Sequence, residues 1–166
     1  MFEKFGEFDS AEELNRAAAA QKEQGDEEAL IALAVENGLD KEDAEDYIDD
    51  CVNELATPLM AAGGKLRVEA EDMKLKGLLM DWQEELYTMC AESPELCAAV
   101  RKKGKELAGY LALIVEKSYE ERSVVNRKIV DKTTKVKSLI GSHDLLIGET
   151  DRKSRRELAE KYYLGR

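Results

Sequence analysis

Helix start and stop signals recur along this chain of 166 residues more regularly than any other pattern. A capping residue opens a segment, an apolar stripe at i, i+3, i+4 spacing follows, and glycine ends it. The first example is Ser10 with Glu13, a capping box that precedes a run of helix formers ending at Gly25. Only two prolines interrupt the chain. The sequence therefore predicts a mainly α, single-domain helical bundle of five to seven helices over residues 1–166.

The same signals predict three helices in the first third of the chain. The first covers about 11–24, and Asp26 caps a second that stops at Gly38. Asp40 caps a third over about 41–56, whose apolar residues recur at helical spacing while the positions between them are polar. We expect residues 1–60 to form an acidic helical subdomain.

The middle of the chain carries the two longest helical patterns, at about 70–92 and 94–121. The run AlaAlaGlyGly at 61–64 predicts a flexible turn before them, and Ser93-Pro94 marks the junction between them. Because this junction is short, we expect the two helices to pair antiparallel. The core residues expected in this pair are Trp82, Leu86, Leu107, Leu111 and Ile114.

Beyond the long pair, the helical signal weakens. VVNRKIVDKTT, from Val124, predicts one short helix, and the runs KVKSLIG and DLLIG predict a small β-hairpin or extended pieces near the C-terminus. Thr150 or Asp151 caps a last amphipathic helix that Gly165 closes. Residues 65–166 are thus expected to hold the long helical pair and a basic C-terminal segment.

The charge of the chain is segregated along its length. The total is −11, yet residues 1–60 hold 18 acidic against 4 basic residues, and residues 101–166 hold 17 basic against 10 acidic residues. Such a field steers association and selects partners rather than folds. It favours a binding protein.

The third predicted helix carries the densest acidic face. Carboxylates spaced along one side of a helix imitate the charge ladder of a nucleic-acid backbone, so this face would fit a protein partner with a basic surface. Alternatively, these acidic side chains form an ordinary solvent-exposed face of the helix and interact favourably with its dipole. No loop here has the ligand spacing of an EF-hand, so calcium binding is disfavoured. The candidate partner-binding residues are Glu42, Asp43, Asp46, Asp49, Asp50 and Glu54.

The basic C-terminal segment is the alternative binding surface. Lysine and arginine contact phosphates, and the nearby tyrosines could stack on bases. The alternative is a solvated helix face diluted by Glu157 and Glu160. The candidate nucleic-acid-binding residues are Arg127, Lys128, Arg152, Lys153, Arg155 and Arg156.

Little in the sequence favours catalysis, a metal or a cofactor. His143 is the single histidine, and no paired cysteine or histidine motif accompanies it. Cys90 and Cys97 fit the core as small apolar residues. Three cysteines and no apolar leader predict a reduced, cytoplasmic protein, and no apolar run has the length that a membrane span needs. We expect a non-enzymatic protein.

Two stretches of the chain carry a wider resemblance: MFEKFGEFDSAEELNRAAAAQKEQGD, running on to GLDKEDAEDYIDDCVNELATPLMAA, and the closing IGETDRKSRRELAEKYYLG. Both resemble small proteins of mobile elements in gut Firmicutes. Acidic helical proteins of this size and origin include anti-CRISPR proteins, which inhibit Cas nucleases, and some of these occupy a basic nucleic-acid groove with a carboxylate-rich surface. The resemblance thus implies a Cas nuclease as the protein partner, without assigning a role to any single residue.

Overall fold

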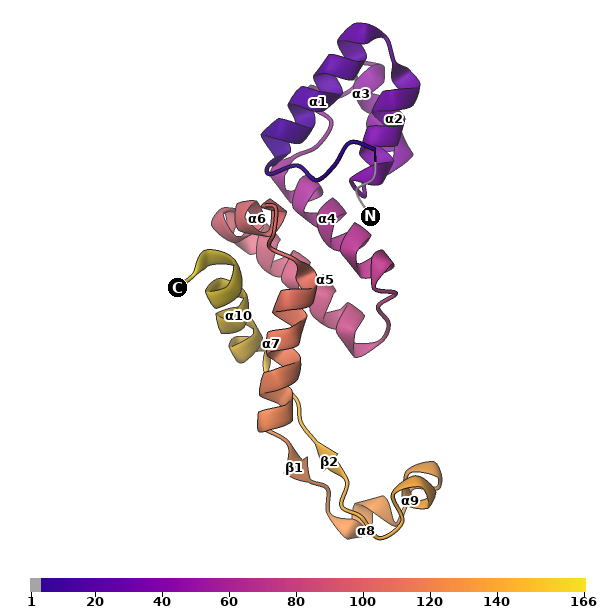
Figure 1. The fold of residues 1–166 in the computed structure, drawn as a ribbon, viewed down its shortest axis with the longest axis vertical. Coiled ribbons are helices and arrows are strands. Elements are labelled where there is room, and N and C mark those ends of the chain that lie inside the picture. The colour runs from indigo at the N-terminus through magenta and orange to yellow at the C-terminus, as the bar shows by residue number, and fades with distance from the viewer. Residues whose placement is uncertain (1–3) are drawn as a thin grey trace.

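The computed structural model, which describes residues 4–166, is mainly helical with one small antiparallel sheet (Figure 1). Those residues form ten α-helices, more than the five to seven predicted, because both long predicted helices are divided and the C-terminal third adds short ones. The elements are α1 Ala11–Gln24, α2 Glu27–Glu36, α3 Lys41–Ile48, α4 Pro58–Asp72, α5 Leu78–Glu92, α6 Pro94–Arg101, α7 Leu107–Glu120, β1 Ser123–Val124, α8 Arg127–Val130, α9 Lys135–Ile140, β2 Leu146–Ile147, α10 Arg152–Ala159 and the π-helix Glu160–Leu164.

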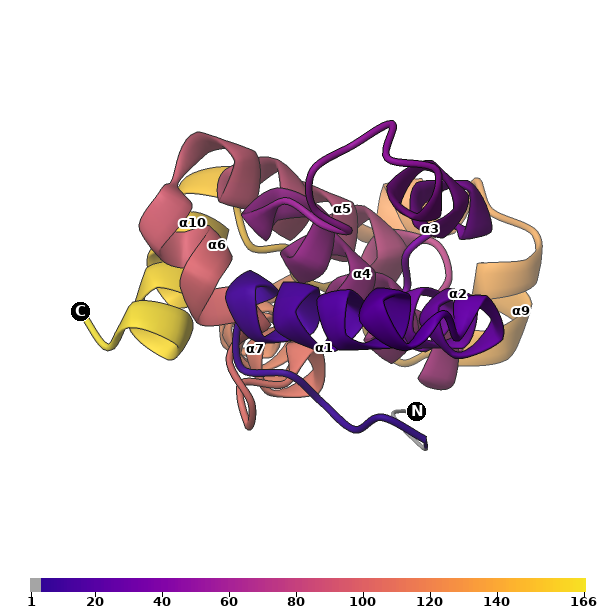
Figure 2. The same cartoon turned by 90° about the horizontal axis from the view of Figure 1, so that it is seen from above.

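The first hydrophobic cluster joins α1, α2 and α3 to the start of α4. The predicted caps are in place: Ser10 accepts a hydrogen bond from the backbone N–H of Glu13, and Asp26 from that of Ala29. Leucines from α1 and α2 fill the cluster, and α1 lies against α4 (Figure 2). Helix α2 is less enclosed than its apolar sequence suggests, since Val35 is 54% exposed.

Helix α3 ends at Ile48, so the predicted helix over 41–56 is wrong in its second half. Lys22 on α1 explains the stop: its Nζ donates to the carbonyl of Tyr47 at 2.5 Å and pairs with Asp50 at 2.6 Å. Asp50 adopts a positive φ of 57°, which few residues other than glycine tolerate. Asp49, Asp50 and Glu54 consequently lie beyond the helix rather than on its acidic face.

The glycine pair is not a flexible turn; Gly63 and Gly64 lie inside α4, which Thr57 and Pro58 begin. A Cβ atom at Gly64 would lie 2.2 Å from the carbonyl oxygen of Asn37, and one at Gly63 would lie 2.5 Å from the Tyr87 ring. Glycine therefore serves here to let the α2–α3 connection and α5 approach α4 closely.

The second hydrophobic cluster packs α4, α5, α6, α7 and α10 together. The five predicted core residues, Trp82 to Ile114, are all buried. The two long helices predicted at about 70–92 and 94–121 are wrong in length, because each of these segments is divided. Lys74 and Gly77 take positive φ angles between α4 and α5, and Gly104 does so between α6 and α7.

A buried polar network connects the two clusters. Arg101 of α6 donates to the side chain of Asn37 at 2.8 Å. Fully buried Lys65 pairs with Glu7 at 2.7 Å and lies 3.8 Å from Glu69, whose carboxylate accepts the N–H of Leu107. Burial raises the pKa of Glu69 above its ordinary value. These contacts hold α4 and α6 against the N-terminal helices.

Residues 123–148, which we call the arm, project from the end of α7 away from α1–α3 (Figure 1). Strand β2 confirms the extended run at DLLIG, but it pairs with β1 (Ser123 with Ile147), and KVKSLIG is helix α9 rather than a strand. Asp131 ties α8 to α9 by pairing with Arg127 and Lys137. Where the arm meets the body, Ser118 and Thr150 share a buried hydrogen bond of 2.6 Å.

Candidate functional site

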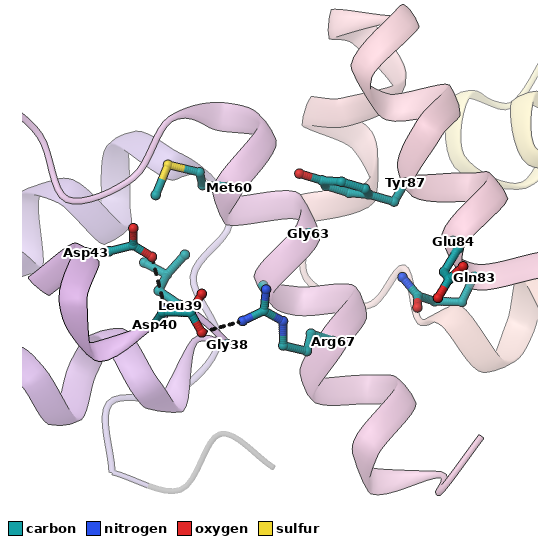
Figure 3. Close-up of a pocket in the computed structure, with 11 residues that line it drawn as sticks. Gly38, Leu39, Asp40, Asp43, Met60, Gly63, Arg67, Gln83, Glu84 and Tyr87 are labelled. Carbon is teal, nitrogen blue, oxygen red and sulfur yellow. Dashed lines mark hydrogen bonds and ion pairs between the residues drawn. The ribbon is translucent and has the colours of Figure 1, made fainter. Parts of the chain in front are cut away.

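A groove runs between the α2–α3 connection, α4 and α5 (Figure 3). Its main hollow, about 470 Å³, meets a smaller one of about 140 Å³ that opens toward the segment after α3. The two hollows share Asp43 and Met60. We call both together the acidic groove. Its main hollow includes Leu39, Asp40, Arg67, Gln83, Glu84 and Tyr87, and its smaller hollow includes Asp46, Val52, Glu54 and Leu55.

The glycines of α4 make the main hollow possible. Gly63 and Gly64 line it and fill none of it, while Met60 on one side and Tyr87 on the other rise above the helix (Figure 3). One wall comes from the N-terminal cluster and the other from α5 of the second cluster. All three elements pack against buried cores, so the fold itself sets the position of the groove walls.

The charges of the acidic groove are only partly neutralised within the protein. Asp40 pairs with Arg67 at 3.0 Å, and Asp43 accepts the backbone N–H of Asp40 at 3.1 Å. Asp46 and Glu84 are exposed and form no ion pair among residues 4–166. Carboxylates beside an exposed tyrosine and a methionine suit lysine or arginine, whose aliphatic stems pack on apolar surface while the charged ends pair.

The predicted acidic residues divide into three groups. Asp43, Asp46 and Glu54 come together in the groove, because the irregular segment after α3 folds back toward α4. Asp50 forms an ion pair with Lys22. The remaining two, Glu42 and Asp49, are exposed without lining either hollow.

Sequence reasoning missed the far wall of the groove. Arg67, Glu84 and Tyr87 belong to α4 and α5, and they meet the α3 acids only through packing of distant segments. The one local signal was the glycine pair, which in a strongly helical context indicates close helix packing as well as a turn.

Three arginines of the predicted basic surface form ion pairs within the protein. Arg155 pairs with Glu85 at 2.6 Å, Arg152 pairs with the same carboxylate at 3.3 Å, and Arg156 pairs with Glu92. The Arg156 hydrogen bond holds the pKa of Glu92 below its ordinary value. These arginines dock α10 onto α5.

The other predicted basic residues lie apart from those three. Lys153 is exposed and near Glu157, whereas Arg127 and Lys128 belong to the arm. The six predicted residues therefore do not form one continuous patch.

The histidine and the two cysteines singled out in the sequence are not brought together in the structure. His143 lies exposed in the arm, and Cys90 and Cys97 are buried in the second cluster. Burial raises the pKa of the Cys90 thiol to about 12, which keeps it protonated and unreactive. Among residues 4–166, no three His, Cys, Asp or Glu side chains are grouped as metal ligands would be.

Within the described part of the chain, every helix is too short or too polar to cross a bilayer. Comparison with protein-family models, with curated proteins and with solved structures found no match.

Proposed function

We propose that this chain is a non-enzymatic binding protein whose acidic groove holds the basic, nucleic-acid-contacting surface of a protein partner. The observation that supports this function best is the groove itself. It combines exposed carboxylates from α3, α5 and the segment after α3 with Met60 and Tyr87, on elements fixed by two cores. A rigid array of this kind avoids an ordering cost on binding.

The partner's chemistry follows from that of the groove. Surfaces that bind phosphates are rich in lysine and arginine, and the same side chains would pair with Asp46 and Glu84. Such a contact would block the surface to nucleic acid. Cas nucleases hold their heteroduplex in a positively charged channel, and the sequence resemblance to mobile-element proteins implies that class of partner.

Nucleic-acid binding through the basic C-terminus is the weaker alternative. Arg152, Arg155 and Arg156 already pair with Glu85 and Glu92. A phosphate would have to displace those carboxylates and release α10 from α5.

The test compares two double variants of equal charge change. Asp46→Asn with Glu84→Gln alters the groove, whereas Glu42→Gln with Asp49→Asn alters exposed acids outside it. The probes are a purified Cas nuclease, with and without guide RNA, and an unrelated basic protein, with binding measured by surface plasmon resonance. We expect the groove variant to lose about tenfold in affinity, or about 1.4 kcal/mol, and the control variant to bind nearly as the parent does.

Equal losses for the two variants would show that only total charge matters and would reject the groove. Binding to the nuclease but not to the unrelated basic protein would support the implied partner class. A gel shift by the free protein that is lost on reversing Arg152 and Arg156 would instead favour the alternative.

A further inference from the structure

The arm exposes more large apolar side chains than its length warrants. Leu139 on α9 is 85% exposed, and Ile129 on α8 is 61% exposed. Val124, Leu146 and Ile147 on the strands are also exposed. The arm thus holds five of the protein's exposed large apolar side chains, and apolar side chains on a projecting element are available to contact another protein.

The arm is also basic. Residues 123–148 contain five lysine or arginine residues against two aspartates, and all five basic side chains are exposed. Asp131 neutralises part of this charge, whereas Lys128, Lys132 and Lys135 form no ion pair among residues 4–166. The arm contains no Phe, Tyr or Trp, so it lacks the rings on which single-stranded bases stack. Its mixture of leucine, isoleucine and lysine fits an acidic protein surface that also carries apolar side chains.

The acidic groove of the same chain is such a surface. Asp46, Glu54 and Glu84 offer negative charge, and Val52 and Met60 offer apolar contact. The arm points away from the N-terminal helices that form one wall of the groove, so it cannot reach the groove of its own molecule (Figure 1). A second copy has no such restriction.

We propose that the arm of one copy docks into the acidic groove of another. Leu139 and Ile129 would pack on Val52 and Met60, and Lys132 and Lys135 would face the carboxylates. The two surfaces are different, so the contact is heterologous, and each copy keeps a free arm or a free groove for the next. Association therefore grows with concentration into open chains or closed rings, and salt weakens it.

This inference uses the groove of the proposed function but does not depend on a foreign partner. A basic partner would compete with the arm for the same carboxylates. The protein would then exchange self-association for partner binding.

The experiment measures molar mass by light scattering and sedimentation, across protein concentration and at low and high salt. An arm variant combines Leu139→Ser with Lys135→Glu, and a groove variant combines Asp46→Lys with Glu84→Lys. A control changes an exposed apolar residue and an exposed lysine elsewhere, with Val35→Ser and Lys161→Glu. Circular dichroism and melting temperature confirm that each variant folds.

We expect the parent and the control to associate and each docking variant alone to lose at least tenfold in affinity for itself. Because the arm variant keeps a working groove and the groove variant keeps a working arm, an equimolar mixture should form a 1:1 heterodimer and stop there. This mixture separates a heterologous contact from a merely charge-dependent one.

Three results would overturn the inference: a parent that stays monomeric up to its solubility limit, an arm variant that associates as the parent does, or a groove variant that does so. The last would mean that arms pair with arms. Failure of the proposed function is read separately, because the arm variant retains the groove and should still bind the nuclease whether or not it self-associates.

Discussion

Adjacent glycines in α4 offer a matched pair of substitutions that tests how the two halves of the protein approach each other. Gly63→Ala and Gly64→Ala each gain about 1 kcal/mol of helix propensity. The atoms that the two new Cβ atoms would approach are different. The new Cβ at Gly64 would lie 2.2 Å from the backbone oxygen of Asn37, whereas the three atoms nearest to that at Gly63 all belong to the ring of Tyr87, a side chain that is 39% exposed and can rotate away.

The backbone clash cannot be relieved by a rotamer change, so the two helical clusters must separate slightly. Overpacking of this kind costs about 1–3 kcal/mol. Taking the upper end for a contact between two anchored backbones, we expect Gly64→Ala to be about 3 kcal/mol less stable than Gly63→Ala. For a chain of this size, that difference corresponds to melting temperatures about 6–12 °C apart.

Urea denaturation followed by tryptophan fluorescence and far-ultraviolet circular dichroism gives the free energy of unfolding of each variant. A Gly64→Ala protein at least as stable as Gly63→Ala would refute the close approach. It would also restore the sequence-based prediction that this segment is a flexible turn, in which both glycines behave alike.

Three further results are expected from the packing and ion pairs. Leu111→Ala should lower the free energy of unfolding by about 2–5 kcal/mol in urea titrations, because the side chain is buried in the second cluster; a loss under about 1 kcal/mol would contradict that burial. A thiol reagent should modify exposed Cys51 quickly in the native protein and reach buried Cys90 and Cys97 only after unfolding, and three equally fast thiols would argue against this core. The pKa of Glu92 is below its ordinary 4.5, so its contact with α10 stabilises fully above that pH and is lost as pH falls through the folded-state value. Glu92→Gln should therefore flatten the decline of unfolding free energy as the pH falls below 4.5, and an unchanged slope would show that the pair contributes nothing.

Helix starts were predictable because their signals are local. Ser10, Asp26 and Asp151 cap the helices that the sequence assigned to them. The missed ends depend on distant residues: α3 stops where Lys22, from α1, meets the Tyr47 carbonyl. The pairing of β1 with β2 across the whole arm likewise has no local signal.

The candidate site was predictable only in part, for the same physical reason. Charge counting located the acidic region, and Asp43 and Asp46 do line the groove. It could not tell that Lys22 occupies Asp50 or that Glu85 neutralises Arg155, since ion pairing depends on the tertiary fold. Tyr87 lies in the site because α5 packs against α4, and no local sequence pattern indicates that packing.

The chain leaves the body after α7 and returns to it just before α10, where Ser118 and Thr150 close the gap. The whole arm is therefore a loop whose two ends meet at a fixed point. The entropic cost of closing such a loop rises only with the logarithm of its length. Closing a loop as long as the arm therefore costs roughly 2 kcal/mol more than closing a tight turn of about four residues. An arm could accordingly lengthen, shorten or change its tip with little effect on how the helical body folds. The helical body thus supports the arm, and the sequence of the arm's tip can change without altering how the body folds.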